Sequence, residues 1–212
     1  DGTEYSVDAI VFATGFDAMT GAVMRVAITG RDGRTMLDAW AAGPVNYLGL
    51  AVPGFPNLFV ITGPGSPSVL TNMIVSIEQH VEWVTDFLKT ARAKGITRIE
   101  ATPEAEEAWN AKCTELVAQT FYPVAKSWYM GANIPGKPRV FMPYVGGFDR
   151  YKKRCDEVAA KGYEGFSLSR HAVVGARAQH DGAAARAHRH RVAGLHAQPG
   201  EFGRVHRCAR LR

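Results

Sequence analysis

A glycine- and serine-rich turn, ITGPGSPS, is the first segment of this sequence whose residue types suggest chemistry. Gly63 and Gly65 follow a short apolar run, and Ser66 and Pro67 precede a new apolar pattern. A strand, a tight turn and a helix start present free backbone N–H groups and the positive end of a helix dipole. In an open parallel sheet, ligands bind at this edge. The turn predicts either a site for an electron-rich ligand edge near Leu70–Met73 or an ordinary strand–helix connection.

A second segment, SWYMGANIPGKPRVFMPYVGG, spans residues 127–147 and combines glycines, prolines and aromatic rings with few charges. It is too apolar for a solvated linker and too broken for regular structure. A loop folded over a pocket, with Trp128 and Tyr129 as its contact surface, fits this composition. A packed surface loop fits it equally well.

Nucleophilic and metal-binding constellations do not emerge from the sequence. His80 is the one histidine before residue 169, and although Glu78 and Glu82 are nearby, no HExxH motif is formed. We therefore predict a structural role for His80 and no metal site. The cysteines are odd in number and form no CxxC pair, which predicts free thiols in a reducing compartment; they are Cys113, Cys155 and Cys208.

Two apolar runs and a long amphipathic pattern must position these segments. VDAIVFA (7–13) and LFVI (58–61) are nearly continuous in apolar residues, which is typical of strands buried on both faces of a parallel sheet. Ser66 and Pro67 are suited to begin a helix that ends at Gly95. The residues of this helix that are expected to face the protein core are Leu70, Ile74, Ile77, Val81, Val84 and Leu88.

Two further helices are predicted beyond Gly95. One begins at Thr102-Pro103 and runs to about Thr120, and the other runs from Phe148 to Lys161 and ends at Gly162.

The net charge of +5 conceals an uneven distribution along the chain. Residues 169–212 hold nine Arg, no Lys and two acids, or +7, which leaves 16 basic and 18 acidic groups, or −2, in residues 1–168. With few large apolar side chains, the 169–212 tail cannot offset its ordering entropy, so we predict a disordered Ala/Arg/His-rich tail. Its composition is typical of a GC-rich coding strand read out of frame; a nucleic-acid arm or metal tract is the alternative.

Membrane and export signals are not evident. No run approaches the ~20 apolar residues of a membrane helix, and no signal peptide begins the sequence, so we expect a cytoplasmic protein without a membrane partner. The opening residues, Asp1-Gly2-Thr3, read like a turn inside a longer protein, and we expect an N-terminal truncation.

Residues 1–168 resemble the C-terminal part of type I Baeyer–Villiger monooxygenases, nearest to the phenylacetone monooxygenase branch. The resemblance runs through DAIVFATGFDAMTGA, GPGSPS, NMIVSIEQHVEWVTD and SWYMGANIPGKPRVFM and covers about four-fifths of the chain. It implies an α/β fold, the incomplete C-terminal portion of a Rossmann-like FAD/NAD(P)-binding flavoprotein. The implied reaction inserts one oxygen atom of O2 into a ketone to give an ester or lactone, with FAD and NADPH as cofactors.

The resemblance also assigns roles to individual residues. Gly15 belongs to the motif at which the chain returns from the NADP domain to the FAD domain. Asn72 and Met73 match positions beside the flavin, where Met73 makes a backbone contact, and Trp128 matches the tryptophan of the loop that closes over NADP. The loop that shapes substrate range corresponds to Pro67, Ser68, Val69 and Leu70, of which the last three are expected to border the substrate.

Several family features are missing from these 212 residues. There is no GxGxxG and no FxGxxxHxxxW, and the segment that carries the family's catalytic arginine is absent, so no catalytic residue is assigned. Arg25 and Arg139 lie in different motifs. Without a pyrophosphate-binding turn, we expect that this chain alone is not a working monooxygenase.

Two alternatives stay open. One is a flavin monooxygenase that oxidises nitrogen or sulfur, against which the SWYMGANIPGKP loop argues. The other is a non-catalytic binding protein whose basic tail contacts nucleic acid, marked by binding that weakens steeply with salt. We expect a protein that is monomeric when full length and does not bind nucleic acid.

Overall fold

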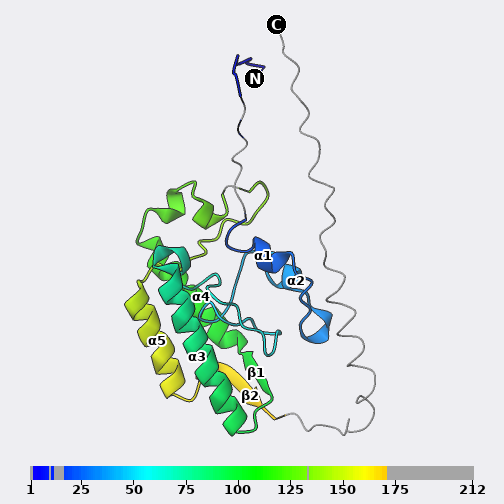
Figure 1. The fold of residues 1–212 in the computed structure, drawn as a ribbon, viewed down its shortest axis with the longest axis vertical. Helices are drawn as coiled ribbons and strands as arrows, with labels where there is room; N and C mark the ends of the chain where they lie inside the picture. Colours follow the sequence, from blue (N-terminus) through cyan, green and yellow to red (C-terminus); the bar gives the residue numbers. More distant parts are fainter. Residues whose placement is uncertain (1, 10, 12–16, 133, 171–212) are drawn as a thin grey trace. The chain divides into compact units, whose positions relative to one another are not determined.

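The fold is mostly helical with one small sheet (Figure 1), in a computed structural model that describes residues 2–9, 11, 17–132 and 134–170. Gly15 and the tail from 171 to 212 lie outside the described residues. The α-helices and strands are α1 (Gly21–Met24), α2 (Met36–Ala39), α3 (Met73–Ala93), β1 (Arg98–Ala101), α4 (Pro103–Ala118), α5 (Phe148–Ala160) and β2 (Phe166–Ser169). Short 3-10 turns are η1 (Arg31–Gly33), η2 (Ser68–Leu70), η3 (Tyr122–Val124) and η4 (Trp128–Met130).

The sheet consists of β1 and β2, which pair antiparallel with Ile99 opposite Leu168 and Ala101 opposite Phe166. Neither strand was predicted from the sequence. Their pairing joins residues almost 70 positions apart, and it brings the end of the described chain beside the start of α4.

The predicted parallel strands are wrong in the described part of the chain. Residues 7–9 and 11 form no strand, and the side chains of Val7 and Val11 are 59% and 85% exposed. Residues 58–60 are not assigned to a strand and Ile61 lies in a turn, although Val60 N donates to Leu50 O over 2.8 Å. An apolar run becomes a strand only where neighbouring strands accept its backbone hydrogen bonds, and the described residues provide none for these runs.

Helix α3 begins later than predicted and buries a different side. Asn72, rather than Ser66, caps it, with its side-chain oxygen accepting from the N–H groups of Ile74 and Val75. The buried residues are Ser76, Gln79, His80, Trp83, Phe87 and Ala91. Of the predicted core side, Ile74, Ile77, Val81 and Leu88 are 68%, 39%, 48% and 49% exposed. The buried side is thus displaced by one residue, or about 100° around the helix.

Helices α4 and α5 are confirmed close to their predicted ends. The side chain of Thr102 caps α4 by accepting from Ala105 N at 3.2 Å, with Pro103 in the first turn. Helix α5 ends at Ala160, and Gly162 follows with a φ of +73°, which favours glycine.

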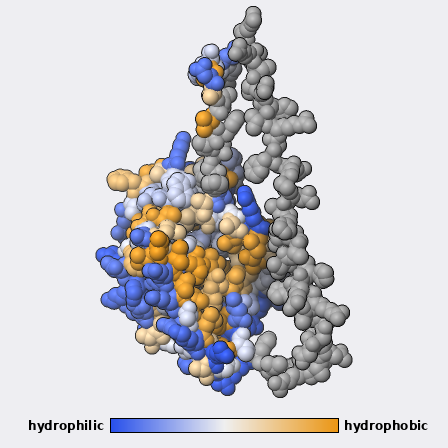
Figure 2. All heavy atoms as spheres, viewed as in Figure 1, coloured by the Kyte–Doolittle hydropathy of each residue, from blue (hydrophilic) through white to orange (hydrophobic). Residues whose placement is uncertain are grey.

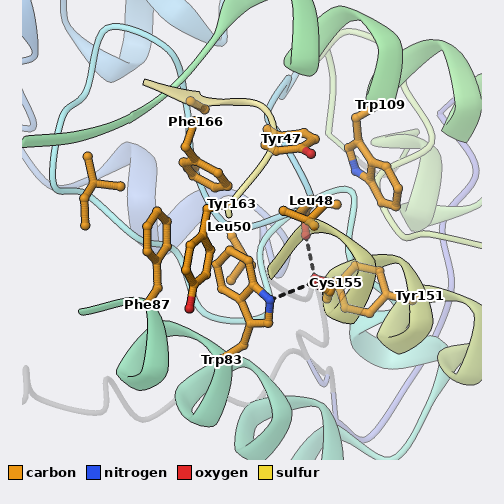
Figure 3. Close-up of a cluster of buried hydrophobic side chains, with 14 of the residues drawn as sticks. Tyr47, Leu48, Leu50, Trp83, Phe87, Trp109, Tyr151, Cys155, Tyr163 and Phe166 are labelled. Carbon is orange, nitrogen blue, oxygen red and sulfur yellow. Dashed lines mark hydrogen bonds between the residues drawn. The ribbon is translucent and has the colours of Figure 1, made fainter. Parts of the chain in front are cut away.

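The main core lies among α3, α4, α5 and the sheet (Figure 3). Phe87 and Tyr163 stack with ring centroids 3.7 Å apart and planes 5° apart. Trp83 packs against them, and its Nε1 donates to Cys155 O at 2.9 Å. A smaller apolar cluster joins α2 to residues 52–55 through Met36, Trp40, Val52 and Phe55. These two cores hold the helices and fix the loops between them.

Candidate functional site

The glycine turn, defined here as residues 61–72, has an unusual backbone. Thr62 and Ser68 have φ angles of +52° and +45°, and Gly65 has +81°. Non-glycine residues with positive φ carry strain of order 1 kcal/mol or more, so the surrounding structure must hold this turn in place. Ser68 is 2% exposed, although its side chain is polar.

Three separate segments hold the turn. The Asn46 side-chain amide donates to Pro64 O, and Trp109 Nε1 of α4 donates to Gly65 O at 3.1 Å. From the other side, Gly65 N donates to Met142 O at 2.6 Å, and Tyr144 N donates to Ser66 O at 2.7 Å. The turn is therefore bound on several sides by protein.

The glycines of the turn are required by this packing. A Cβ on Gly63 would lie 2.6 Å from Gly49 O, and one on Gly65 would lie 2.9 Å from the Asn46 Oδ1 atom. The sequence suggested that these glycines let a ligand approach. In the structure, they let the protein's own backbone and side chains approach.

The end of the turn meets the start of α3, where several predicted site residues come together. Ser68 Oγ lies 4.0 Å from Met73 Sδ. Val69 and Leu70 are half-buried in η2, and Asn72 is exposed. Because Asn72 occupies the N–H groups of Ile74 and Val75, the Met73 N–H is the amide of this first turn that has no acceptor among the described residues.

The aromatic loop, defined here as residues 127–147, is irregular as predicted. Trp128 is 37% exposed and packs on Tyr129 with ring centroids 4.1 Å apart. Tyr129 and Phe141 both pack on Tyr122, which follows α4. Trp128 thus belongs to an aromatic group at the end of α4, whereas Met73 belongs to the start of α3.

A partly buried ion pair ties the aromatic loop to the N-terminal segment. Lys137 Nζ donates to Asp17 Oδ1 and, at 2.8 Å, to Thr20 Oγ1, which itself donates to Asp17 Oδ1 at 2.9 Å. Burial raises the pKa of the Asp17 carboxyl, but hydrogen bonds from Lys137 and Thr20 outweigh burial, so the pKa lies below its ordinary value. The Asp17 carboxyl therefore stays ionised at neutral pH, and its contact with Lys137 ties the loop to the N-terminal segment.

Two cavities flank the aromatic loop. One of about 320 Å³ is lined by Asp17, Lys137 and Trp40, among others, and none of Ser68, Val69 and Leu70 is among its described lining residues. The other, about 440 Å³, lies between α4 and residues 139–142. Both volumes suit small organic molecules. Trp128 and Tyr129, the predicted contact surface, are not among the described lining residues of either cavity.

His80 anchors the beginning of the glycine turn. Its Nδ1 accepts from Thr62 N at 2.9 Å, and its Nε2 lies 2.6 Å from the Tyr151 hydroxyl, which donates to Leu48 O at 2.6 Å. These partners suit a neutral imidazole that donates from Nε2 to Tyr151. Burial lowers the pKa of His80 to about 4. The structural role predicted for His80 agrees with this arrangement.

Comparison with known proteins places these segments in one group of enzymes, although no protein-family model matches the chain. The chain is 46% identical over 170 residues to acetone monooxygenase (methyl acetate-forming) of Gordonia sp. (strain TY-5), covering 80% of this chain and 32% of the relative. It is 42% identical over 162 residues to a Baeyer–Villiger monooxygenase of Pseudooceanicola batsensis, covering 76% and 29%. The chain is a homologue of part of the Baeyer–Villiger monooxygenases. It spans about a third of the length of these relatives.

Solved structures agree with the relationship to Baeyer–Villiger monooxygenases. The fold matches a closed crystal structure of cyclohexanone monooxygenase with a TM-score of 0.75 at 44% identity, covering 80% of this chain and 32% of that one. It matches an oxidised steroid monooxygenase bound to NADP with a TM-score of 0.72 at 48% identity, covering 80% and 31%. The predicted resemblance is thereby confirmed, and so is the assignment to part of this flavoprotein fold.

One of the homologues is named for the oxidation of nitrogen rather than of a ketone. Phenazine N-monooxygenase of Lysobacter antibioticus is 43% identical over 168 residues, covering 79% of this chain and 31% of the relative. This part of the fold is therefore shared by enzymes named for ketone and for nitrogen oxidation, while the nucleic-acid-binding alternative receives no support.

Sequence reasoning missed several groups that organise this site. Asp17 and Lys137 both lie in motifs of the Baeyer–Villiger resemblance, but their 120-residue separation hid their pairing. Asn46 and Trp109 lie in segments without a recognisable chemical pattern. Of these four residues, only Asp17 and Lys137 could have been suspected from the sequence, because each is a charged residue of opposite sign within an otherwise apolar motif.

Proposed function

We propose that this chain forms part of a flavin- and NADPH-dependent Baeyer–Villiger monooxygenase, which inserts one oxygen atom of O2 into a ketone to give an ester or lactone. The convergence of three motif segments carries the proposal. Lys137 binds Asp17 of the N-terminal segment, and Met142 O accepts from Gly65 N of the glycine turn. The aromatic loop is thus bonded to both other segments at once.

The residues at the start of α3 fit an FAD edge. The Met73 N–H lacks an acceptor among the described residues, and it stands at the positive end of the 21-residue helix α3. We propose that Met73 and Asn72 border the flavin and that Gly15 lies near it. When bound, FAD and NADPH supply the redox chemistry, while this chain's residues bind and orient.

The aromatic loop fits a closing role over NADP. Trp128 is partly exposed on the loop, while Lys137 and Met142 attach the loop to the rest of the site. We propose that Trp128 contacts the bound NADP. Ser68, Val69 and Leu70 would border the ketone, with half-buried apolar side chains at Val69 and Leu70.

The chain would supply only one wall of this active site. Its sequence has no GxGxxG turn to bind a pyrophosphate. Apolar side chains of α3 are also left exposed in the described part, and Figure 2 shows apolar side chains gathered over this face. We propose that in a complete enzyme the α3 side chains are covered, and that the 212-residue chain by itself does not oxidise NADPH.

A chimera tests the proposal. Residues 1–170 replace the matched third of the Gordonia acetone monooxygenase, and the chimera is assayed for bound flavin, NADPH oxidation and product by mass spectrometry. We expect ketone-dependent NADPH oxidation with an ester as product. A chimera that folds and holds FAD but gives no ester from linear, cyclic or aryl ketones would overturn the proposal, and N-oxide formation from a phenazine would favour the alternative.

A Lys137→Met chimera gives a sharper readout. It should retain FAD but lose coupling, so that NADPH is consumed with less ester, because the aromatic loop loses its bond to Asp17. Lys126→Met, at an exposed position just before the same loop, is the matched control.

In the described part of the chain, no helix is long and apolar enough to cross a bilayer. We further propose that the full-length protein is cytoplasmic and monomeric and does not bind nucleic acid.

A further inference from the structure

A separate cavity of about 590 Å³ lies between α4 and the segments that pack on it. Its walls come from α4 (Ala108, Trp109), from α5 (Arg154) and from Tyr47, Tyr144 and Gly165. None of the residues predicted to bind cofactor or substrate is among its described lining residues. Its volume is within the range of small-molecule sites.

The floor of this cavity is aromatic. Trp109 and Tyr144 are nearly parallel, with ring centroids 5.3 Å apart and planes 12° apart, and Tyr47 is a third aromatic member of the lining. Two of their polar atoms already have protein partners, because Trp109 Nε1 donates to Gly65 O and the Tyr47 hydroxyl donates to Glu164 O. The three residues are only 3–6% exposed, so what they offer the cavity is a small apolar area, which favours an apolar occupant.

Charged groups stand around this aromatic floor. Arg154 has carboxylate partners at 3.7 and 3.8 Å, on Glu164 and Glu157, which is beyond hydrogen-bond distance. Its guanidinium can therefore turn to a ligand carboxylate and form a two-point contact. Lys112 adds a second cation from α4, although it also pairs with Glu115 at 2.8 Å.

The acidic groups limit the charge of the occupant. Glu104 and Glu164 also line the cavity, so its four charged side chains sum to zero. A phosphate or a dicarboxylate would meet this acidic wall at a cost, whereas one carboxylate directed at Arg154 would not. Glu164 also pairs with Lys161 at 3.4 Å, so a ligand carboxylate that draws Arg154 away would not leave Glu164 without a cation.

We propose that this cavity binds a small aromatic monocarboxylate, with its ring on Trp109 and Tyr144 and its carboxylate on Arg154. The residues of this cavity differ from those proposed above to border the cofactors and the ketone. The cavity is nevertheless connected to the glycine turn, because the same Trp109 that forms the floor donates to Gly65 O.

Binding of 2-naphthoate tests the proposal, with 2-naphthamide as its uncharged counterpart, by ligand-detected NMR and quenching of tryptophan fluorescence. Binding is measured directly, so the result does not depend on oxygenase activity. Both the 212-residue chain and the chimera are used, so that the test does not rely on the folding of a single protein. We expect 2-naphthoate to bind roughly tenfold more tightly than 2-naphthamide, the size of one charge-assisted contact. Arg154→Gln should remove that difference, whereas Lys153→Gln, an exposed neighbour on α5, should preserve it.

A second pair of variants tests the location. Ala108→Phe should fill the cavity and abolish binding of both probes, while Ala111→Phe, an exposed position on α4 that is not among the lining residues, should leave binding unchanged. Equal binding by the two phenylalanine variants would overturn the proposal. So would preferential binding of 2-naphthylamine derivatives or phosphate, or failure of 2-naphthoate to bind at millimolar concentration to both folded proteins.

Discussion

The two sides of α3 differ in a way that their hydrophobicity does not explain. One side places Ser76, Gln79 and His80 in the interior, although all three are polar. The adjacent side exposes Ile74, Ile77 and Val81. Burial on this helix therefore follows the partners that other segments provide, and not the hydrophobicity of the helix alone.

On the buried polar side, His80 has specific partners, whereas the Ser76 hydroxyl and the Gln79 Oε1 atom have none among the described residues. His80 accepts from Thr62 N and contacts Tyr151, and Tyr151 donates to Leu48 O. A buried polar group costs little when its hydrogen bonds are formed. Further along the same side, Trp83 and Phe87 fill the aromatic core (Figure 3).

The exposed apolar side has no comparable partner among the described residues. Exposed apolar groups that gather on one surface are typical of a surface that another part of a protein covers. The contrast between the two sides can be tested by substitutions at adjacent positions. His80 on the buried side, for example, is followed directly by Val81 on the exposed side.

The largest expected effect concerns His80. His80→Ala should lower the free energy of unfolding by about 3 kcal/mol, because it opens a cavity and leaves the buried Thr62 N–H without its acceptor. Val81→Ala, one residue away, should lower it by less than about 0.5 kcal/mol. Urea unfolding followed by tryptophan fluorescence measures both, and equal losses would contradict the distinction between the sides.

The pH dependence of stability should depend on the same histidine. Since burial lowers the pKa of His80 to about 4, the unfolded chain, with a histidine pKa near 6.5, binds more protons between these values. The stabilisation is complete above pH 6.5 and decreases as the pH falls to 4, by up to about 3 kcal/mol. Tyr151 and Cys155 stay neutral in this range, because burial raises the pKa of both.

A comparison with His80→Gln isolates this contribution. The difference in unfolding free energy between the original chain and the variant, measured from pH 4 to pH 8, should grow with pH and level off near pH 7. A difference that does not change with pH would mean that His80 is accessible to protons in the folded state.

Ser76 should give a smaller effect of opposite sign. Its hydroxyl is buried without a hydrogen-bond partner among the described residues, so Ser76→Ala removes an unsatisfied group and favours the helix. We expect a gain of about 1 kcal/mol in unfolding free energy. A loss of stability in the same urea experiment would show that the hydroxyl does have a partner.

The smallest change in stability is expected on the exposed side. Ile77→Lys should alter the unfolding free energy by no more than about 0.5 kcal/mol, while reducing binding of the dye ANS, which reports exposed apolar surface. Thr85→Lys is the matched control, since it adds one cation at an exposed position of the same helix without removing a charge or a large apolar group. Unfolding of the Ile77→Lys variant would indicate that this side is buried.

Local sequence signals predicted α4 and α5 well. The Thr102 cap, the proline after it and the glycine after α5 act within a few residues, so their effect can be read from the sequence. Gly63 and Gly65 were also recognised as a tight turn, but the reason for them was not: the atoms that exclude a Cβ, Gly49 O and Asn46 Oδ1, come from a distant segment.

The sequence by itself determined the relationship to Baeyer–Villiger monooxygenases, the ends of α4 and α5, and the lack of a dinucleotide-binding turn in these residues. Only the tertiary structure decided which side of α3 is buried, whether residues 58–61 form a strand, and that Lys137 pairs with Asp17. The physical reason is the range of the interactions. Caps and turns are completed by near neighbours, whereas the burial of a helix side, a strand or an ion pair depends on which distant segments are present to contact it.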